Sequence, residues 1–343
     1  MTADEALTAI GRDPEARAAI VAALKRFERL PVNRFTTVRD DVVGPIVDAL
    51  HADAGTLRKQ LSNGLVFEFP YRSKIARDFV MSVPERPDHV WEPQTTRLLV
   101  HLGRDAGHAL VGGAYFGDQA IPIAHAMRGR GTCHAFEPDA DQAAMVARNA
   151  ALNGLDNVRV HPLGLWSDSA ARLAFVGADA LAATVAAETG VAATTIDDYV
   201  RDAAIDRLGL VMLDLEGAEF EVLKGAAGTV ERDRPAIVFE IHRAFVDWSD
   251  GVERTAIVRF LAARGYTILA VRDFQSNVAL PPGPIELVPL DGAYLDGPPH
   301  GFNLVALPDV ALIADPLFRI VPGVSPKLLF HRDPALHHPT GGL

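Results

Sequence analysis

The segment Leu210-Val211-Met212-Leu213-Asp214-Leu215-Glu216-Gly217-Ala218-Glu219 places an apolar run of strand length directly before three acidic residues. A helical pattern with apolar Phe220 and Leu223 begins where the strand pattern stops. In an open α/β sheet the carboxyl ends of the strands form the crevice that binds ligands, so we expect these acids at its edge. The alternative is an ordinary strand-to-helix turn that is acidic without a functional reason.

Strand-length apolar runs recur from about Thr95 onward, with helical stretches between them. This alternation predicts an α/β fold with a mostly parallel sheet. The seven expected strands are His108 to Gly112, Thr132 to Phe136, Val158 to Leu163, Leu208 to Leu213, Ala236 to Phe239, Gly265 to Val271 and Phe302 to Ala306. The last two are joined by a loop with too little helical pattern for a crossover, so we expect an antiparallel pair at the sheet edge.

The beginning of the chain has a different pattern. Asp13-Pro14-Glu15 is a helix start, since Asp caps a helix and Pro suits its first turn. Asn63-Gly64 is a turn signal, and Leu65 to Phe69 alternates like a half-buried strand. We expect a mainly helical N-terminal extension with a short strand over residues 1–90, the α/β domain over residues 91–312, and an irregular C-terminal tail over residues 313–343.

Composition limits the class of protein. The 343 residues are 49% hydrophobic, which is enough for one large core or two smaller ones. The formal net charge of -11 argues against a nucleic-acid partner, because no basic stripe can replace the counterions on phosphates. The single cysteine, Cys133, excludes an intramolecular disulfide. With no long apolar run and no secretory pattern at the N-terminus, we expect no membrane span and a cytoplasmic location.

A strand followed by a glycine-rich turn, Ala109 to Asp118, precedes a helix-compatible segment from Gln119 to Met127. Glycine lets the backbone pass close to a ligand, and the helix start offers N–H groups. Glu137 in Phe136-Glu137-Pro138 ends the next strand, where an acid can bind a pair of ribose hydroxyls. The turn and the acid together are typical of a nucleoside-binding half-sheet.

The turn also indicates which nucleoside binds. A dinucleotide fingerprint has glycine at positions one, three and six, and the middle glycine allows contact with a pyrophosphate. Counting from Gly112, position three is Ala114, whose methyl group disfavours a pyrophosphate. This substitution favours S-adenosylmethionine, which has none. A non-catalytic nucleoside-binding protein and a nicotinamide-dependent oxidoreductase stay open as alternatives.

The chain resembles the FkbM-type S-adenosylmethionine-dependent methyltransferases over about Trp91 to Leu307. The motifs that carry the resemblance are Val111 to Gly117, Phe136-Glu137-Pro138 with Asn149 and Asn153-Gly154, Thr195-Ile196-Asp197-Asp198, Asp214 to Glu219 with Val222 to Gly225, and Glu240 with His242. The resemblance implies a Rossmann-like class I methyltransferase sheet and methyl transfer to a hydroxyl oxygen of a saccharide or natural-product acceptor.

Two positions depart from the family's usual Asp-Val-Gly-Ala-Asn turn. Val111 stands in place of the aspartate and Tyr115 in place of the asparagine. The resemblance implies that the missing acid lies beside the methionine portion of the cofactor. Either Asp118 or the group around Asp214 replaces it, or cofactor binding is weakened.

For the cofactor we expect contacts from the glycine turn, the ribose acid and the end of the acidic strand, namely Gly113, Ala114, Tyr115, Gly117, Asp118, Glu137, Pro138 and Asp214. Trp166 and Asp168 are candidates for stacking on the adenine ring and for binding its amino group. The alternative for this pair is a core tryptophan and an ordinary loop acid.

Methyl transfer to a hydroxyl needs a base, and the candidates are Asp214, Glu216, Glu240 and His242. Glu240 and His242 are two residues apart on a strand, which places them on one face. We interpret His242 as the base, assisted by Glu240, because an unperturbed imidazole titrates near neutrality. Asp214 and Glu216 then orient the acceptor or the methionine end of the cofactor. A capping role for His242 and a structural role for Glu240 are the alternatives.

The four candidate residues could also hold Mg²⁺ or Mn²⁺, although we adopt a metal-free interpretation. The acceptor is expected to be a small molecule or a saccharide, facing the loop from Asp273 to Gly301 and the N-terminal helices. The N-terminal elements are too few for an independent core. They are therefore expected to lie over the opening of the cofactor-binding site or to form the contact of a possible homodimer.

Overall fold

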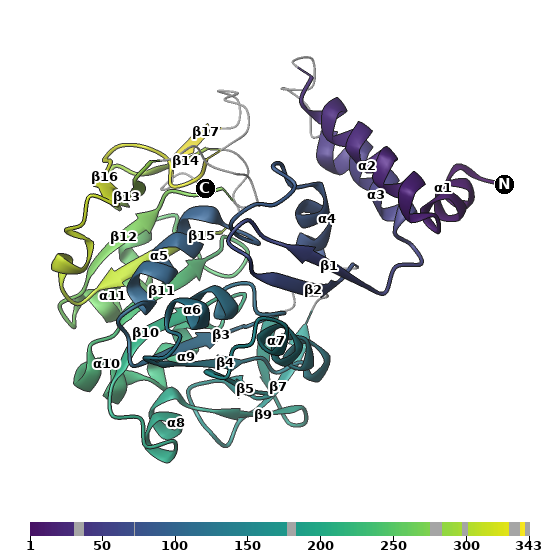
Figure 1. Cartoon of the computed structure of the whole chain (residues 1–343). Helices are drawn as coiled ribbons and strands as arrows, with labels where there is room; N and C mark the ends of the chain where they lie inside the picture. Colours follow the sequence, from purple (N-terminus) through teal and green to yellow (C-terminus); the bar gives the residue numbers. More distant parts are fainter. Residues whose placement is uncertain are drawn as a thin grey trace.

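A nine-stranded sheet forms the centre of the computed structural model, which describes residues 1–30, 38–71, 73–176, 183–274, 283–296, 301–328 and 337–339. Its strand order is β16-β13-β12-β15-β11-β10-β3-β4-β5 (Figure 1). The strands are β3 (His108–Gly112), β4 (Thr132–Phe136), β5 (Val158–His161), β10 (Leu208–Leu213), β11 (Ala236–Ile241), β12 (Thr267–Val271), β13 (Ile285–Pro289), β15 (Phe302–Leu307) and β16 (Phe318–Ile320).

The pairing within this sheet is mixed but mostly parallel. Strands β5, β4, β3, β10 and β11 pair in parallel. Strand β15 lies antiparallel between β11 and β12, which confirms the antiparallel pairing expected for the last two strands. Their expected place at the sheet edge is wrong, because β13 and β16 extend the sheet beyond β12. Seven strands remain when β13 and β16 are left out. Their first in chain order, β3, lies between the fourth and the second, and their last, β15, is inserted antiparallel between the fifth and the sixth. This is the class I methyltransferase arrangement of a Rossmann-like sheet, as the sequence predicts.

The expected number of seven strands is too low. Strand β13 pairs antiparallel with β12, and β16 pairs in parallel with β13. Strand β13 follows directly after the proline-rich segment 281–284, and β16 has only three residues, two of them exposed. Neither has a clear alternating pattern of its own. The region expected to be an irregular tail thus supplies an edge strand and the short β17 (His337–Pro339), which pairs with β14 (Tyr294–Asp296). The proline-rich segment and the residues after Phe330 otherwise lie largely outside the described residues.

Helices cover both faces of the sheet. Neighbouring residues on one strand, such as Val111 and Leu110 or Met212 and Val211, belong to two different buried hydrophobic clusters. The helices are α5 (Pro93–Gly103), α6 (Ala120–Ala126) and α7 (Ala140–Leu152) over the first cluster, and α8 (Ile196–Asp202), α9 (Glu219–Lys224), α10 (Ala227–Asp233) and α11 (Ala256–Ala262) over the second. The period of two along the strands therefore produces a three-layer α/β/α core. Among the described helices, none is long and apolar enough to cross a membrane.

A second, four-stranded sheet follows β5 and has no clear signal in the sequence. Its order is β6-β9-β7-β8. The strands are β6 (Gly164–Leu165), β7 (Arg172–Val176), β8 (Ala183–Ala187) and β9 (Val191–Thr194).

The N-terminal region consists of a helical arm and a hairpin. The elements are α1 (Ala3–Gly11), α2 (Pro14–Glu28), a π-helical turn (Arg39–Val43), α3 (Gly44–Leu50), β1 (Thr56–Gln60), β2 (Val66–Pro70) and α4 (Lys74–Met81). Asp13 caps α2, as the sequence predicts, by accepting from the N–H groups of Glu15 and Ala16. Figure 1 shows the helices α1, α2 and α3 extending away from the main sheet. The β1–β2 hairpin lies closer, with β2 against α7.

Two asparagines at the C-terminal end of α7, Asn149 in the helix and its C-cap Asn153, fix this hairpin in place. The carboxamide of the fully buried Asn149 donates to the carbonyls of Glu68 and Phe116, at 2.8 and 2.7 Å, and accepts from the Glu68 N–H at 2.7 Å. Asn153 forms a similar pair of bonds with the backbone of Val66. Because Phe116 belongs to the glycine-rich turn after β3, the same side chain holds both the hairpin and that turn.

Replacing Asn149 with Ala should lower the free energy of unfolding by about 2–4 kcal/mol, because it removes three hydrogen bonds and leaves buried backbone groups without partners. Urea denaturation followed by circular dichroism measures this change. Gln142→Ala, on the same helix and half-buried, is the control and should alter stability much less. Equal stability of Asn149→Ala and the parent would show that the hairpin is held by its apolar contacts alone.

Candidate functional site

The candidate site lies where β3, β4, β10 and β11 end. The glycine turn (Gly112–Gly117) follows β3, and the N–H groups of Gly113 and Ala114 both donate to the Phe136 carbonyl, at 3.1 and 3.0 Å. Gly113 has φ +75°, and a Cβ at this position would lie 1.8 Å from the carbonyl oxygen of Asp214. Only glycine fits there, since both the backbone angle and the contact exclude a side chain. The turn is therefore pressed directly against the end of β10.

Glu137, directly after β4, holds the other side of the glycine turn. One carboxylate oxygen accepts from the Tyr115 N–H at 2.8 Å and the other from the Asp139 N–H at 2.9 Å. Burial raises the pKa of Glu137 to about 7. Each carboxylate oxygen can accept a second hydrogen bond, so the group still has capacity for hydroxyls.

Tyr115 adopts a backbone angle that is uncommon for its residue type. Its φ is +50°, in the left-handed region that asparagine tolerates better than an aromatic residue. Asparagine, which the resemblance predicts at this position, tolerates this angle better than tyrosine does. In this chain the hydrogen bond to Glu137 helps to hold Tyr115 in that conformation.

A small, largely apolar cleft opens beside the glycine turn. Its lining includes Gly113, Phe136, Pro138, Leu163, Leu165 and Leu215. Neither Trp166 nor Asp168 is among the described residues that line it. The N–H of Trp166 donates to the Thr194 carbonyl, and the exposed Asp168 caps the N–H of Ala170. The cleft thus brings together the glycine turn and Pro138 but not the two residues expected at an adenine ring.

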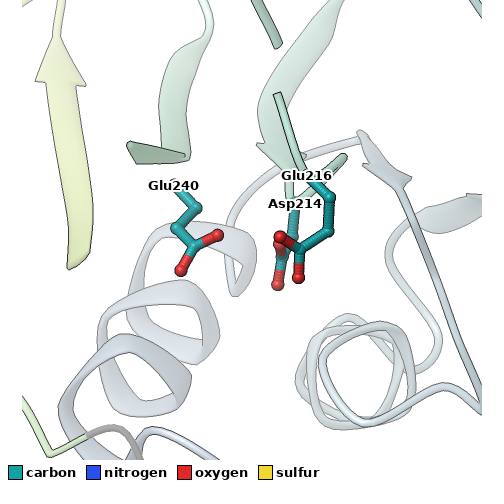
Figure 2. A group of neighbouring side chains, drawn as sticks. All are labelled: Asp214, Glu216 and Glu240. Atoms are coloured by element: carbon teal, nitrogen blue, oxygen red, sulfur yellow. The ribbon is translucent and has the colours of Figure 1, made fainter. Parts of the chain in front are cut away.

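Three carboxylates meet at the ends of β10 and β11. Asp214, Glu216 and Glu240, here called the acid cluster, each offer an oxygen, and these atoms all lie within 4.8 Å of one another. Figure 2 shows Glu240 approaching the other two from the neighbouring strand. Since β10 and β11 pair in parallel, their carboxyl ends come together at one edge of the sheet.

Glu219 has a different place from the one expected at the edge of the crevice. Its carboxylate accepts from the N–H of Leu215 at 2.8 Å and from the N–H of Gly217 at 3.1 Å. Burial raises its pKa to about 7. Glu219 therefore braces the loop that presents Asp214 and Glu216.

Electrostatics link the acid cluster to Asp118. Burial raises the pKa of Asp118 to about 7, and the nearby charge of Asp214 adds to the rise. Burial also raises the pKa of Glu240 well above its ordinary value, with further contributions from Asp214 and Glu92. Asp118 and Asp214, the two acids expected to replace the family's turn aspartate, thus lie close enough to influence each other.

Several residues of this site have no clear signal in the sequence. Glu92 precedes α5 with φ +47°, is 5% exposed, and has a pKa raised well above its ordinary value by burial and by Asp214. Asn303 on β15 donates to the Glu92 carboxylate at 2.7 Å. Lys327 is 4% exposed, and burial lowers its pKa to about 8, opposed by Glu240. The only hint in the sequence is an acid before Pro93 at a helix start.

Lys327 reaches this site because its backbone is tied to the end of β12. The Asp273 N–H donates to the Pro326 carbonyl at 2.8 Å, and the Leu328 N–H donates to the Asp273 carbonyl at 2.7 Å. The Asp273 carboxylate in turn accepts from the N–H groups of Gln94 and Thr95 at the start of α5. Segments far apart in the chain therefore converge behind the acid cluster.

His242 lies one residue beyond β11. Its Nδ1 accepts from the Ala244 N–H at 2.9 Å, and its ring lies 5.3 Å from that of Phe245. In a neutral imidazole with Nδ1 as acceptor, the hydrogen is on Nε2. The bond to Ala244 thus fixes Nδ1 as the acceptor of the imidazole ring.

The strand order and the glycine turn define a class I methyltransferase fold. Residues 112–268 match the sequence profile of the Methyltransferase FkbM domain. This part of the chain is accordingly a methyltransferase domain of the FkbM family. No curated protein matches the chain by sequence.

Solved structures show more distant similarity. Methyltransferase FkbM from Methylobacillus flagellatus is 16% identical, over 59% of this chain and 44% of that chain, with a TM-score of 0.36. The tRNA (uracil-54, C5)-methyltransferase of Pyrococcus abyssi, solved with S-adenosyl-L-homocysteine, is 14% identical over 73% and 43%, with a TM-score of 0.36. The O-methyltransferase TomG of Streptomyces achromogenes, solved with S-adenosylmethionine, is 14% identical over 63% and 80%, with a TM-score of 0.34. The present chain spans less than half of the first two.

Proposed function

We propose that this protein is an S-adenosylmethionine-dependent O-methyltransferase that acts on a hydroxyl group of a saccharide or natural-product acceptor. The observation that carries the proposal is the direct contact between the glycine turn and the acidic end of β10, within an FkbM methyltransferase domain. This contact brings a place for a nucleoside next to a group of carboxylates that can accept a proton.

The residues around the glycine turn fit the proposed cofactor. Glu137 would bind the ribose hydroxyls. The apolar cleft beside Pro138 is the candidate place for the adenine, although its volume of about 10 Å³ holds only one water molecule, so it would have to widen on binding. Asp118 and Asp214 supply negative charge for the sulfonium and ammonium groups of the methionine portion.

A dinucleotide fits this turn less well than S-adenosylmethionine does. The N–H groups of Gly113 and Ala114 already donate to the Phe136 carbonyl, so they are not directed at a pyrophosphate. This supports the sulfonium cofactor over a nicotinamide.

When bound, S-adenosylmethionine supplies a methyl group on a positively charged sulfur. The acceptor hydroxyl must lose its proton as its oxygen takes that methyl group, so a base is needed within hydrogen-bond reach. We assign this role to Glu240, because a half-buried carboxylate with a raised pKa is a better base near neutrality than an exposed one with an ordinary pKa. His242, with its ring hydrogen on Nε2, would orient the acceptor oxygen. This reverses the roles that the sequence suggests for the two residues.

The direct test is methyl transfer by the purified full chain. The protein is incubated with methyl-labelled S-adenosylmethionine and a panel of saccharides and hydroxylated natural products, and the products are analysed by mass spectrometry. The proposal requires at least one acceptor to gain a methyl group on oxygen, with release of S-adenosylhomocysteine. Labelling on nitrogen or carbon only, or no transfer together with no cofactor binding, would refute it.

The affinity for S-adenosylmethionine should rise between pH 6 and 7.5. Asp118 and Glu137 have pKa values raised to about 7 in the absence of cofactor, so both are partly protonated below that pH. A cationic ligand favours the ionised carboxylates, and binding must then release protons, at about 1.4 kcal/mol per pH unit for each proton. Calorimetric titration at several pH values measures this slope. In Asp118→Asn the slope should be shallower, and an affinity that stays constant or falls with pH would contradict the assignment.

A further inference from the structure

We propose that the acid cluster binds one divalent cation of the Mg²⁺ or Mn²⁺ class, with the carboxamide oxygen of Asn303 as a neutral donor beside it. The inference deepens the proposed function, on which the role of the cation rests. The existence of the site can be tested without methyl transfer.

The geometry of the three carboxylates suits such an ion. One oxygen each from Asp214, Glu216 and Glu240 lies within 4.8 Å of the others (Figure 2). Ligands on opposite sides of an octahedral ion with bonds of about 2.1 Å are about 4.2 Å apart, so small movements bring all three oxygens into one coordination sphere. Hard carboxylate oxygens are the ligands these ions prefer.

The negative charge around the acid cluster also favours the binding of a cation. Three carboxylates this close repel one another, and Glu92 and Asp118 add to the negative charge that acts on Asp214 and Glu240. The buried Lys327 interacts with Glu240, but a single ammonium group cannot balance this number of acids.

The buried side chain of Asn303 supports a bound cation independently of the three carboxylates. It lies directly opposite Glu240 in the antiparallel β11–β15 pair, so both side chains point to the same face of the sheet. Asn303 is 3% exposed, and its Nδ2 donates to Glu92 and Thr95. Within the described part of the chain its buried Oδ1 has no hydrogen-bond partner. A buried oxygen without a hydrogen-bond donor is unfavourable unless a ligand binds to it. A cation, or a water molecule bound to one, would do so.

The proposed ion gives the site a way to activate an acceptor hydroxyl. A divalent cation that binds a hydroxyl oxygen lowers its pKa and so eases loss of the proton. Each carboxylate of the acid cluster can give one oxygen to the ion and keep a second. Glu240 can therefore bind the ion through one oxygen and accept the proton on the other. Because the ion also lowers the pKa of Glu240, the lowered pKa of the acceptor hydroxyl, and not the raised pKa of Glu240, then drives the proton transfer.

The test uses the full chain, freed of metal with EDTA and dialysed, and Mn²⁺ alone as the probe. The electron paramagnetic resonance signal of free Mn²⁺ is followed during titration. We expect one Mn²⁺ per chain with a dissociation constant below about 1 mM, and displacement by excess Mg²⁺. Glu216→Gln and Asp214→Asn should each weaken binding by at least about tenfold, and Asn303→Leu by a smaller factor. The control is Glu253→Gln, which changes an exposed acid outside the cluster and should bind as the parent does.

Two results would overturn the inference. One is the lack of stoichiometric Mn²⁺ binding up to several millimolar, and the other is binding that is equal in the parent and in folded Glu216→Gln. Titration with S-adenosylmethionine in the presence of EDTA distinguishes failure of the cation site from failure of the proposed function. Cofactor binding without Mn²⁺ binding rejects only the cation site, whereas an absence of cofactor binding rejects the function.

Discussion

Replacing Glu240 with Gln should lower the turnover of methyl transfer by a factor of about 10² to 10⁴, the usual contribution of a general base. Glutamine keeps the shape of the side chain but cannot accept the acceptor's proton. The affinity for S-adenosylmethionine should change little, because the base acts mainly in the transition state. Turnover with the acceptor found by mass spectrometry, and calorimetric titration of the cofactor, measure the two quantities separately.

The comparison with His242 makes this prediction specific. If His242 orients the acceptor through Nε2–H, His242→Ala should reduce turnover less than Glu240→Gln does. The exposed Glu253→Gln is the control and should leave turnover unchanged. Turnover of Glu240→Gln within a factor of about three of the parent would mean that this residue is not the base. Positioning by Asp214 and Glu216 would then be the better account.

Replacing Glu137 with Ala should weaken the binding of S-adenosylmethionine by about 1.5 to 3 kcal/mol, the range for hydrogen bonds to a charged group. This corresponds to a loss of affinity of about 10- to 150-fold. The variant also removes the acceptor for the Tyr115 N–H, so the glycine turn loses one of its supports. Calorimetric titration with S-adenosylmethionine gives the loss directly.

Glu137→Gln is the matched variant for this second prediction. It keeps the volume of the side chain and one oxygen that can accept from Tyr115, but loses the second oxygen and the charge. An intermediate affinity is therefore expected. If Glu137→Ala binds the cofactor as tightly as the parent, this carboxylate does not contact the ribose.

The central strands could be predicted because each carries its own signal. Apolar runs such as His108–Gly112, Thr132–Phe136 and Leu208–Leu213 are buried between two layers of helices, so burial alone marks their limits. Strand β16 could not be predicted in this way, because most of it is exposed and it is fixed by pairing with β13. The same holds for the small β6–β9 sheet, whose strands are short and pair mostly with one another.

The acid cluster was predictable only in part. Asp214 follows β10, Glu240 lies near the end of the neighbouring parallel strand β11, and the topology alone brings them together. Asn303 and Lys327 reach the same place from distant segments through tertiary contacts, which no local pattern indicates. His242 was expected on the strand beside Glu240, yet β11 ends at Ile241, and the ring accepts from the backbone of Ala244. The rule that residues two apart on a strand point to the same face therefore does not apply to His242.

The central claim is that the glycine turn and Glu137 bind S-adenosylmethionine. Calorimetric titration of the full chain at pH 7.5 tests it most directly, with S-adenosylmethionine and NAD in parallel and with Glu137→Ala as the comparison. The account predicts one S-adenosylmethionine per chain, clearly weaker binding in Glu137→Ala, and no comparable binding of NAD. Binding of NAD with none of S-adenosylmethionine would contradict it.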